Sequence, residues 1–370
     1  MKVFSVVPSV SLEASGPSYS VVKAIESLRL IGVSAFVVTL FYKKSISNDY
    51  ILEFKHNLNF RFGFSLEMFV FLWRQLDKNS VLHIHGMWQA NSIIPVVIAK
   101  FKGAKCACSP RGSLSEWSLG QGSVFKPYIW HIAQKPVLKL VDLFIATSEA
   151  EQADLLKLGF KQPIEVVPNG IDIPKLAESD LSKRRKQVLF LSRIHPKKGL
   201  DFLLRVWGKL QHNFPDWSLV ICGDDVSFFG KSGYLETLIR LSMQNDLKRV
   251  EFRGSVNGEE KVRAYLESSI FVLPTHNENF GMVVAEALSF AIPVVVSNHA
   301  PWSKLDSVGA GTCIPLEESA FERALTKLFN LDPSERQEMG LNGRQFVNET
   351  YRWRSIAFSL KYCYENILKS

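Results

Sequence analysis

The stretch Gln187–Cys222, QVLFLSRIHPKKGLDFLLRVWGKLQHNFPDWSLVIC, alternates an apolar run, a polar turn, an amphipathic segment and a second apolar run. Gln187–Leu191 and Trp217–Cys222 are mostly continuous apolar runs, as expected for parallel strands that are covered on both faces. Leu200–His212 has its apolar residues at helical spacing. The stretch therefore predicts a strand–helix–strand unit, the repeating element of a doubly wound α/β sheet.

The same alternation extends in both directions and restarts once. Earlier strands are predicted at Lys2–Val7, Ser34–Leu40, Val81–Ile84, Lys105–Ser109, Leu143–Thr147 and Ile164–Val167, and later ones at Val250–Phe252, Ile270–Leu273 and Pro293–Ser297. Helices are predicted at Tyr19–Ile31, Tyr234–Asn245, Val283–Phe290 and within Ser334–Leu368. We expect two Rossmann-like domains, residues 1–173 and 187–345, with a polar linker at 174–186 and a C-terminal helix at 346–370. Ligands of such sheets bind at the carboxyl ends of the strands, and we expect the cleft between the domains to hold the site.

Composition narrows the class of protein. The 370 residues are 46% hydrophobic and 22% charged, which is an ordinary globular balance. A net charge of +8, without a long basic run, does not indicate a nucleic-acid-binding protein, but it suits an anionic lipid or a phosphorylated substrate. Five cysteines without a C-x-x-C pair favour a reducing compartment and no zinc site. The N-terminus lacks signal-peptide features and no apolar run reaches about 18 residues, so we expect a cytoplasmic protein with at most peripheral membrane contact.

The first candidate site is Glu278-Asn279-Phe280-Gly281-Met282-Val283-Val284-Ala285-Glu286, between a predicted strand and a predicted helix. Glu278 lies in the loop and Glu286 inside the helix, so the two carboxylates could reach two ends of one elongated ligand. The start of the helix offers free backbone N–H groups for a phosphate or for sugar hydroxyls. Glu286 stands among apolar residues, where a charge is costly without a partner.

The second candidate, Ser192-Arg193-Ile194-His195-Pro196-Lys197-Lys198-Gly199, also follows a strand and precedes a helix. Arg193 and Lys198 are suited to clamp a diphosphate and to stabilise a departing nucleotide diphosphate. A basic surface turn is the alternative. No D-x-D triplet occurs, so a metal–diphosphate bridge has no obvious ligands and we expect no metal cofactor.

Three weaker candidates lie in the first half. His85, in His83-Ile84-His85-Gly86-Met87-Trp88, is placed at the carboxyl end of a strand to bond a sugar hydroxyl, whereas His83 is expected to be a satisfied core residue. Gly16, in Ser15-Gly16-Pro17-Ser18, would let the backbone approach a phosphate. Arg111, in SPRG, and Trp88 are candidates for acceptor or cleft contacts, although Arg111 could equally form an interdomain salt bridge.

Two aromatic stretches could lie on a membrane surface or in the core. Phe60–Arg74 has few charges, and Phe125–Val141 interleaves aromatic residues with Lys126, Lys135 and Lys139. A core helix is the preferred interpretation for the first stretch. For the second, both interpretations stay open.

These motifs resemble those of the GT-B fold retaining glycosyltransferases of family 4, the glycosyltransferase group 1 proteins. The resemblance covers nearly the whole chain and is clearest from Gln187 to Ser297. HIHGMW, SPRG, IATSEAE and VVPNGID resemble the bacterial members that build O-antigen lipopolysaccharide, capsule or exopolysaccharide. It implies transfer of a hexose from a nucleotide diphosphate sugar to a glycan or lipid-linked acceptor, without a metal. From the positive net charge and the Phe125–Val141 stretch we expect peripheral attachment to the inner face of the plasma membrane.

The resemblance also implies roles for single residues. Arg193 and Lys198 would hold the donor diphosphate, and Glu286 the ribose hydroxyls. Glu278 and the amides of Asn279, Phe280, Gly281 and Met282 would hold the transferred sugar. His85 would lie near the anomeric carbon, Gly16 near the phosphates, and the last helix would cross back to the first domain. The chain departs from the family at Asn279 and Ala291, where glycine is frequent.

Two other functions share this fold. A nucleotide-sugar epimerase or hydrolase would bind the same donor, and a non-catalytic scaffold subunit of a polysaccharide complex would need none of the four charged site residues. The intact set of Arg193, Lys198, Glu278 and Glu286 argues against the scaffold.

Overall fold

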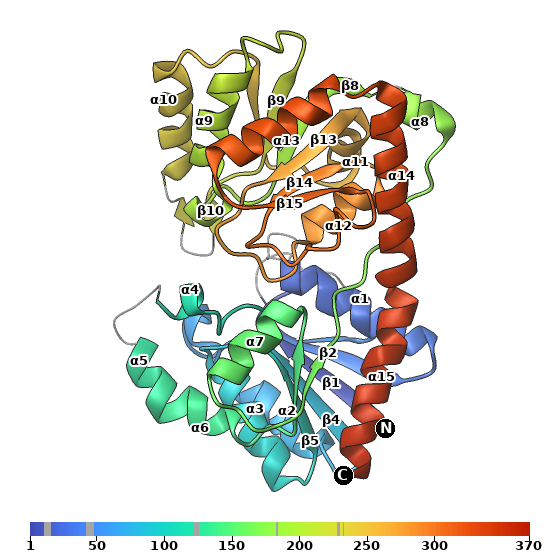
Figure 1. Ribbon diagram of the computed structural model, residues 1–370. Helices are drawn as coiled ribbons and strands as arrows, with labels where there is room; N and C mark the ends of the chain where they lie inside the picture. Colours follow the sequence, from blue (N-terminus) through green and yellow to red (C-terminus); the bar gives the residue numbers. More distant parts are fainter. Residues whose placement is uncertain (11–15, 42–47, 121–125, 183, 228–229, 232) are drawn as a thin grey trace. The chain divides into compact units, whose positions relative to one another are not determined.

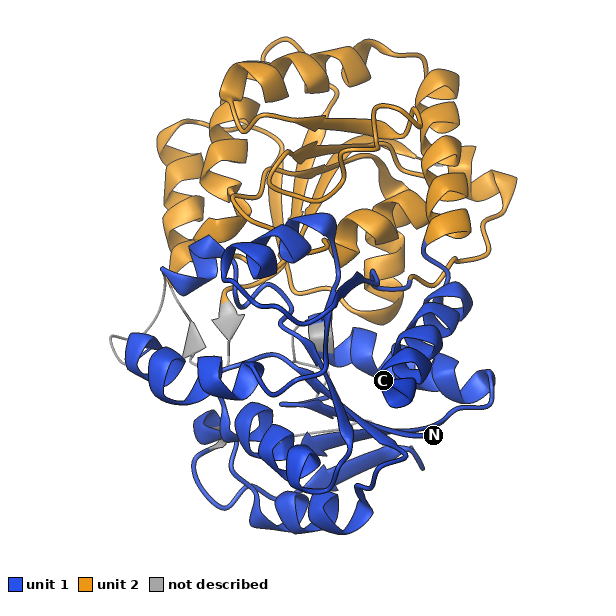
Figure 2. Ribbon diagram, turned by 60° about the horizontal axis from the view of Figure 1, so that its bottom comes forward, with its two compact units in different colours: residues 1–170, 351–370 blue, residues 171–350 orange. Residues whose placement is uncertain are grey.

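The computed structural model describes the whole chain except residues 11–15, 42–47, 121–125, 183, 228–229 and 232 (Figure 1). The chain forms two compact units: residues 1–170 with 351–370 make unit 1, and residues 171–350 make unit 2 (Figure 2). Each unit is built on a parallel β-sheet with helices packed against it, so the prediction of two Rossmann-like α/β domains is confirmed.

Unit 1 contains a seven-stranded parallel sheet whose first half runs backward through the sequence and whose second half runs forward. In sheet order the strands are β3 (Ile51–Phe54), β2 (Ser34–Leu40), β1 (Lys2–Val7), β4 (Ser80–His85), β5 (Lys105–Ser109), β6 (Leu143–Ala146) and β7 (Ile164–Val166). The direction of winding therefore reverses between β1 and β4. Loops that leave these two strands diverge, which opens a natural binding crevice at the carboxyl end of the sheet.

Both faces of this sheet are covered. Alternate residues of β1 belong to two separate apolar clusters, Phe4 and Val6 to one and Val3 and Val7 to the other. The first cluster packs under α2 (Leu66–Gln75), α3 (Ala90–Phe101), α6 (Lys135–Leu138) and α7 (Glu149–Lys157), and the second under α1 (Gly16–Leu30) and α15 (Trp353–Lys369). Helix α15 thus closes the core of unit 1 although it follows unit 2 in the sequence (Figure 1).

Unit 2 repeats the same winding with six strands. Their order is β12 (Val250–Gly254), β9 (Ser218–Cys222), β8 (Arg185–Leu191), β13 (Ser268–Leu273), β14 (Val294–Ser297) and β15 (Gly311–Ile314). The sheet is flanked by α9 (Leu200–Leu210), α10 (Tyr234–Gln244), α11 (Gly258–Glu267), α12 (Met282–Ser289), α13 (Glu318–Asn330) and α14 (Pro333–Thr350). Here the reversal falls between β8 and β13, which are direct neighbours.

Several predicted segments differ in detail. The predicted linker contains a short helix, α8 (Glu178–Ser182), and β8 already begins at Arg185; Lys183 lies outside the described residues. The smaller elements α4 (Glu116–Leu119), β10 (Val226–Ser227) and β11 (Gly230–Lys231) were not predicted. Ala291, where the family resemblance led us to expect glycine, has φ +57° and is fully buried just after α12. Glycine is favoured at such left-handed helix ends, which explains that expectation.

The two aromatic stretches are only partly core. In the first, Met68, Phe69 and Leu72 are buried, whereas Leu66, Val70 and Trp73 are exposed along α2. The second forms one uninterrupted helical run made of α5 (Lys126–Ile129), the π-helical turn η2 (Trp130–Gln134) and α6. Its first residue, Phe125, lies outside the described residues.

Candidate functional site

In unit 2, the candidate residues lie in the loops that leave β8 and β13 and in helix α12, which follows the second loop. Val188 and Leu189 of β8 pair with Ile270 and Phe271 of β13, so the loops that follow these strands start side by side. Residues 192–199 and 274–281 therefore meet at the point where the winding reverses. Strand order thus joins two motifs that are about 80 residues apart in the sequence.

Close backbone contacts lock these loops together. A Cβ atom on Gly199, which has φ +69°, would lie 2.0 Å from the carbonyl oxygen of Pro274, and one on Gly223 would lie 1.9 Å from that of Ser192. The His276 N–H donates to the Lys197 carbonyl oxygen over 2.8 Å, and the Thr275 hydroxyl donates to the same oxygen over 3.1 Å. Only glycine permits such approaches, so the loops form one rigid platform.

Lys198 and Glu278 form an ion pair on this platform. The Lys198 ammonium donates to Oε2 of Glu278, and the two side chains are only 11% and 14% exposed. The Asn279 N–H donates to Oε1 of Glu278 over 3.1 Å. Burial acts to raise the pKa of Glu278, but the charge and hydrogen bond of Lys198 outweigh it, so the pKa is lowered. Glu278 is therefore held as a carboxylate with a fixed direction.

Glu286 has its own set of donors on α11. The Lys261 ammonium donates to Oε1 of Glu286 over 2.7 Å, and the Tyr265 hydroxyl donates to Oε2 over 2.7 Å. Burial is the main cause that raises the pKa of Tyr265, so its hydroxyl stays protonated as a donor. Each carboxylate oxygen accepts one bond here and has a further lone pair for a ligand. Sequence reasoning missed Lys261 and Tyr265; its only signal was that Glu286, among apolar residues, would need a partner.

Other predicted donor-site residues differ in exposure. Arg193 is exposed, and its guanidinium makes no hydrogen bond or ion pair with a described residue. Neighbouring Lys197 is half-buried, and burial lowers its pKa to about 8. Gly281, with φ +80°, is the N-cap of α12, whose first residue is Met282. An α-helix leaves its first N–H groups unbonded within the helix, so α12 presents donors beside Glu278.

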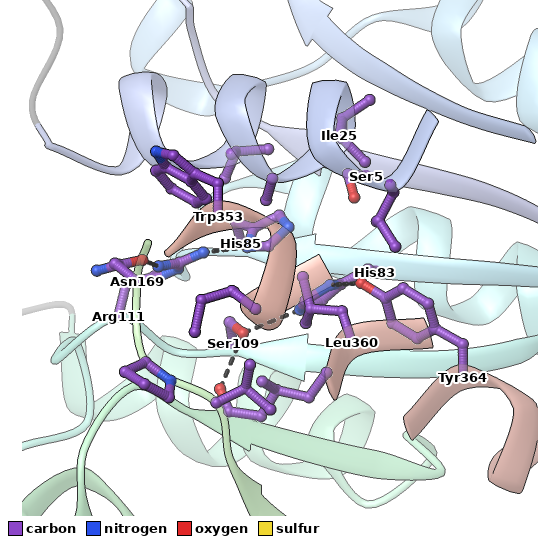
Figure 3. A pocket seen from close by; sticks show the side chains of 17 residues that line it. Ser5, Ile25, His83, His85, Ser109, Arg111, Asn169, Trp353, Leu360 and Tyr364 are labelled. Atoms are coloured by element: carbon purple, nitrogen blue, oxygen red, sulfur yellow. Dashed lines mark hydrogen bonds between the residues drawn. The ribbon is translucent and has the colours of Figure 1, made fainter. Parts of the chain in front are cut away.

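Unit 1 contains a pocket between the carboxyl ends of its strands and the helices α1 and α15 (Figure 3). His83 and His85 enter it from β4, Ser109 and Arg111 come from β5 and the following loop, and Tyr364 comes from α15. Asn169 and Trp353 complete the polar part of the lining. The remaining lining side chains are mostly apolar.

His83 lies at the centre of a chain of hydrogen bonds. Its Nδ1 is 2.7 Å from the Tyr364 hydroxyl, and its Nε2 is 2.9 Å from the Ser109 hydroxyl. Ser109 donates its only proton to the carbonyl oxygen of Ile145 over 2.8 Å, so it must accept from His83. His83 thus carries its proton on Nε2 and accepts from Tyr364. Burial, followed by the charge of Arg111, lowers the pKa of His83 to about 3, so the ring is neutral.

His85 is the neighbour of His83 on the same face of β4, with the ring centroids 3.9 Å apart. Its Nδ1 lies 3.3 Å from Nη2 of Arg111, and Nη1 of Arg111 donates to Oδ1 of Asn169. A guanidinium can only donate, so Nδ1 of His85 accepts and the proton of the neutral ring is on Nε2. Burial and the charges of His83 and Arg111 hold the pKa of His85 well below its usual range. His85 is therefore a hydrogen-bond donor at Nε2.

Glu151 supports the loop that carries Arg111. Its carboxylate accepts from the Gly112 N–H over 2.6 Å and from the Thr147 N–H over 2.7 Å. Arg111 itself has φ +57°, a conformation that costs about 1–2 kcal/mol for a residue other than glycine. Glu151 lies in the IATSEAE motif, but nothing in the sequence indicated which loop it would hold.

Two weaker candidates lie away from this pocket's lining. Trp88, with φ +77°, packs against Trp130 at a centroid distance of 5.9 Å, and its backbone N–H donates to Oε1 of Gln134 over 2.9 Å. Gly16 is the first residue of α1, and a Cβ added there would meet nothing within 4 Å. Ser15 of the same motif lies outside the described residues.

Two further searches concern only the part of the chain that the structure describes. There, no three His, Cys, Asp or Glu side chains come together in a way that could hold a metal ion. No helix there combines the length and the apolar character needed to cross a bilayer.

Comparison with family models gives two adjoining matches. Residues 173–346 match the model of the glycosyl transferases group 1, and residues 14–175 match that of glycosyltransferase family 4. The two matches meet where unit 1 passes into unit 2, and together they run over most of the chain.

Curated relatives match over part of their length. A D-inositol 3-phosphate glycosyltransferase of Mycolicibacterium gilvum is 30% identical over 235 residues, which are 59% of this chain and 51% of that protein. A GDP-mannose-dependent alpha-(1-6)-phosphatidylinositol monomannoside mannosyltransferase of Mycolicibacterium smegmatis is 29% identical over 214 residues, 52% of this chain and 53% of that protein. The match thus spans about half the length of these relatives.

Solved structures show the same fold at low identity. HepE of Anabaena, in complex with UDP and glucose, superposes with a TM-score of 0.77 and 17% identity, covering 98% of this chain and 99% of that one. A glycosyltransferase of Rickettsia africae superposes with a TM-score of 0.72 and 18% identity, covering 100% and 99%.

Proposed function

We propose that this chain, which belongs to the glycosyl transferases group 1 and has the GT-B fold, moves a hexose from a nucleotide diphosphate sugar to an acceptor. The observation that carries the proposal is the platform of unit 2. Two directed carboxylates, Glu278 and Glu286, and the buried cation Lys198 lie at the winding reversal of a Rossmann-like sheet, where such sheets bind nucleotides.

Different residues of this platform are suited to bind different parts of the donor. Glu286 has a free lone pair on each oxygen and is suited to accept from both ribose hydroxyls. Lys198 and the exposed Arg193 would hold the diphosphate, where a fixed cation also stabilises the charge that develops on departure. Glu278 and the amides from Asn279 to Met282 would bind the hydroxyls of the transferred sugar.

In unit 1, His85 would donate from Nε2 to the sugar near the anomeric carbon. Because Arg111 holds Nδ1 as an acceptor, His85 has no lone pair left to act as a base. The acceptor hydroxyl must therefore pass its proton elsewhere, and an oxygen of the departing diphosphate is suited to take it. We therefore propose transfer on one face of the sugar, with retention and without a metal.

For the acceptor, we favour a glycan or lipid-linked glycan of a bacterial surface polysaccharide. The motifs HIHGMW and SPRG, which resemble those of enzymes for such polymers, support this choice. The M. smegmatis relative, whose name specifies a phosphatidylinositol-linked acceptor, is consistent with a lipid-linked substrate.

The direct test is to incubate the full chain with a panel of nucleotide sugars and of glycan and lipid-linked acceptors, and to identify products by mass spectrometry. Transfer with retained anomeric configuration is expected. An epimerised or hydrolysed donor, produced equally well without acceptor, would replace the proposal by an epimerase or hydrolase. Absence of nucleotide binding would favour a scaffold subunit.

Peripheral attachment to the cytoplasmic face of an anionic membrane is part of the proposal. Tyr128, Ile129 and Ile132 are exposed on α5 and η2 and form an apolar surface. The lysines contribute less than their number suggests, because Lys126 donates to the Ser118 carbonyl oxygen and Lys135 lies 5.9 Å over the Trp130 ring. Attachment therefore rests more on apolar insertion than on charge.

Liposome flotation tests this attachment. The full chain should float with anionic vesicles at low salt, and Ile132→Glu should reduce flotation more than the triple change Lys126→Glu, Lys135→Glu and Lys139→Glu. If the wild type ignores anionic vesicles, membrane attachment through this surface is wrong.

A further inference from the structure

We propose that Trp302 is a positioning residue for the transferred sugar: it fixes the backbone between Glu278 and α12, and thereby sets which sugar hydroxyls the donor site accepts. This inference rests on the proposed function, which it deepens by assigning donor-sugar selectivity to a residue outside the two motifs of the platform. The observation behind it is a row of hydrogen bonds between two loops that follow neighbouring strands of unit 2.

The loops that leave β13 and β14 are joined step by step along their length. Leu273 of β13 pairs with Val296 of β14, so the two loops start side by side. Three hydrogen bonds then connect them at successive positions. These run from the Ser297 hydroxyl to the Thr275 carbonyl oxygen over 2.5 Å, from the Glu278 N–H to the His299 carbonyl oxygen over 3.0 Å, and from the Trp302 indole N–H to the Phe280 carbonyl oxygen over 2.6 Å. The loop after β13 is therefore held on both sides, because residues 192–199 contact it from the side of β8.

The Trp302 side chain is packed into this contact. It is 2% exposed, and its ring lies against that of Phe280 at a centroid distance of 5.5 Å. A Cβ atom added to Gly281 would lie 3.2 Å from the indole nitrogen of Trp302 and 3.2 Å from Cγ of Glu278. The indole and the Glu278 side chain thus lie on the same side of Gly281. A shift of the indole would disturb both the backbone and the carboxylate of the donor site.

The hydrogen bond from Trp302 also decides which way a backbone amide points. In a planar trans peptide unit the C=O and the N–H point in opposite directions. Because the Phe280 carbonyl points at Trp302, the Gly281 N–H points away from it. The N–H groups of Gly281, Met282 and Val283 make no hydrogen bond to a described residue, as is usual at the start of a helix. Trp302 therefore orients donors that we assign to the transferred sugar.

A role in core packing alone would predict a loss of stability and nothing more. Trp207, on α9 of the same unit, has such a role. It is 1% exposed, and its indole N–H donates to the Lys248 carbonyl oxygen over 2.9 Å. Lys248 precedes β12, so this contact lies at the amino end of the sheet, away from the platform. Trp207 is therefore a matched control, with a buried ring and the same type of hydrogen bond at the opposite end of the strands.

The first measurement is hydrogen exchange of the ligand-free full chain, followed at the N–H groups of Val284 and Ala285. Both donate to the Gly281 carbonyl oxygen, over 2.9 and 3.3 Å, so their exchange reports opening of the first turn of α12. Trp302→Phe should speed this exchange about fivefold, because one hydrogen bond that holds the turn is lost. Trp302→benzothienylalanine, which keeps the shape of the ring and replaces its N–H by sulfur, should do the same. Trp207→Phe should leave it within about twofold, because the two sites are far apart.

The second measurement compares a nucleotide with the same nucleotide carrying a sugar. UDP is paired with UDP-glucose and GDP with GDP-mannose, and each affinity is measured by calorimetry. Trp302→Phe should weaken the sugar nucleotide about fivefold and the nucleotide by less than about twofold, because the amides that Trp302 orients contact only the sugar. Trp207→Phe should change neither affinity.

With an active donor–acceptor pair, selectivity is measured as the ratio of kcat/KM between the preferred sugar nucleotide and its epimer. This ratio should fall about threefold in Trp302→Phe and stay constant in Trp207→Phe, since discrimination depends on contacts made to the sugar. A merely structural role would lower the amount of active enzyme and leave the ratio unchanged.

The outcomes separate this inference from the proposed function. Unchanged exchange in both Trp302 variants, or an equal loss of affinity for nucleotide and sugar nucleotide, would overturn the inference. The same conclusion holds if Trp207→Phe reproduces the effects of Trp302→Phe. If the wild type binds no nucleotide, with or without a sugar, the proposed transferase function fails, whereas faster exchange in the Trp302 variants would still show that Trp302 positions the loop.

Discussion

In unit 2 both carboxylates of the candidate site are paired with a lysine, whereas the pocket of unit 1 holds one cation among neutral groups. Lys198 faces Glu278 and Lys261 faces Glu286, each pair joined by a direct hydrogen bond. In unit 1, Arg111 bonds a neutral amide and a neutral imidazole. Both regions occupy the winding reversal of the same kind of sheet, so the difference lies in the side chains and not in the fold.

The contrast indicates how each region would interact with a ligand. In unit 2, each carboxylate already accepts a hydrogen bond from a lysine, so it stays ionised and keeps a fixed direction. A ligand there would bind beside donors that are already in place. In unit 1, Arg111 bonds only neutral groups among the described residues, so its charge is not paired directly. The following predictions test this distinction, from the largest expected effect to the smallest.

Breaking one pair in unit 2 should have the largest effect on stability. Lys198→Met leaves the carboxylate of Glu278 buried and unpaired, and losing one partner of a buried pair costs about 3–5 kcal/mol. Urea unfolding of the ligand-free protein measures this loss. Adding Glu278→Leu to Lys198→Met should restore part of it, because the second change removes the orphan charge. If the double variant is less stable than the sum of the two single losses, the pair is not what stabilises this platform.

Acid should weaken unit 1 before unit 2. The pKa of His83 is lowered from 6.5 to about 3 in the folded state. Between these two pH values, His83 is therefore protonated in the unfolded chain and neutral in the folded protein. Stability from His83 is therefore complete above pH 6.5 and falls as the pH drops toward 3, by about 2 kcal/mol at pH 5. Glu278, whose folded pKa is also lowered, loses its contribution only below about pH 4.5.

Unfolding free energies at pH 7 and pH 5 check this order. His83→Asn should remove a substantial part of the dependence between these values, because His85, whose pKa is also lowered, keeps its own share, whereas His56→Asn, at an exposed histidine, should leave it intact. An unchanged pH slope in His83→Asn would contradict the neutral, buried state of this ring.

Tyr265→Phe should weaken nucleotide diphosphate binding about fivefold. The change removes one hydrogen bond to Glu286, worth about 1 kcal/mol, and keeps the ring that stacks on Phe290. Glu286→Ala should cost more, about 1.5–3 kcal/mol, because a charge-assisted contact is lost. Calorimetry with UDP and GDP measures both, with Tyr362→Phe as an exposed control. Equal affinity in all four proteins would remove Glu286 from the donor site.

Arg111→Met should change stability by less than about 1 kcal/mol without ligand, because the lost hydrogen bonds are offset by removal of an unbalanced charge. This is the counterpart of Lys198→Met in the other region, and the same urea titration measures it. A loss as large as that in Lys198→Met would mean that Arg111 is already fully compensated in the empty protein.

Chelation should have no effect. The charges that serve the proposed diphosphate site are those of Lys198 and Arg193, so transfer should survive EDTA at full rate. A complete loss that magnesium or manganese restores would contradict this assignment.

The sequence predicted the helices and strands better than it predicted which of them lie next to each other. Continuous apolar runs identified strands such as Gln187–Leu191 and Ile270–Leu273, because burial on both faces leaves a local signature. Nothing local tells that these two strands pair, so the ion pair between Lys198 and Glu278 could not be predicted even though each residue was singled out. The need of Glu286 for a partner was predictable from its apolar neighbours, but the identity of that partner was not.

The polar partners in unit 1 were harder to find. Tyr364 bonds His83 across 281 positions, and on its own helix it looks like any buried aromatic residue. Trp353 also looks like any buried aromatic residue in the sequence. Only the packing shows that its indole N–H has no hydrogen-bond partner among the described residues. The π-helical turn within the Phe125–Val141 stretch has a local cause, since Pro136, which follows it closely, has no N–H to donate to an α-helical hydrogen bond.

Helix α15 also sets the order in which the protein can be completed during synthesis. Residues 351–370 belong to unit 1 but follow all of unit 2, so the ribosome makes residues 171–350 before it makes the helix that covers Val3, Val7 and Val81. At roughly 5–20 residues per second, that face of the nascent sheet is covered by α1 alone for about 10–40 seconds. During this interval unit 2 can fold to completion, while unit 1 presents an apolar surface that suits a chaperone.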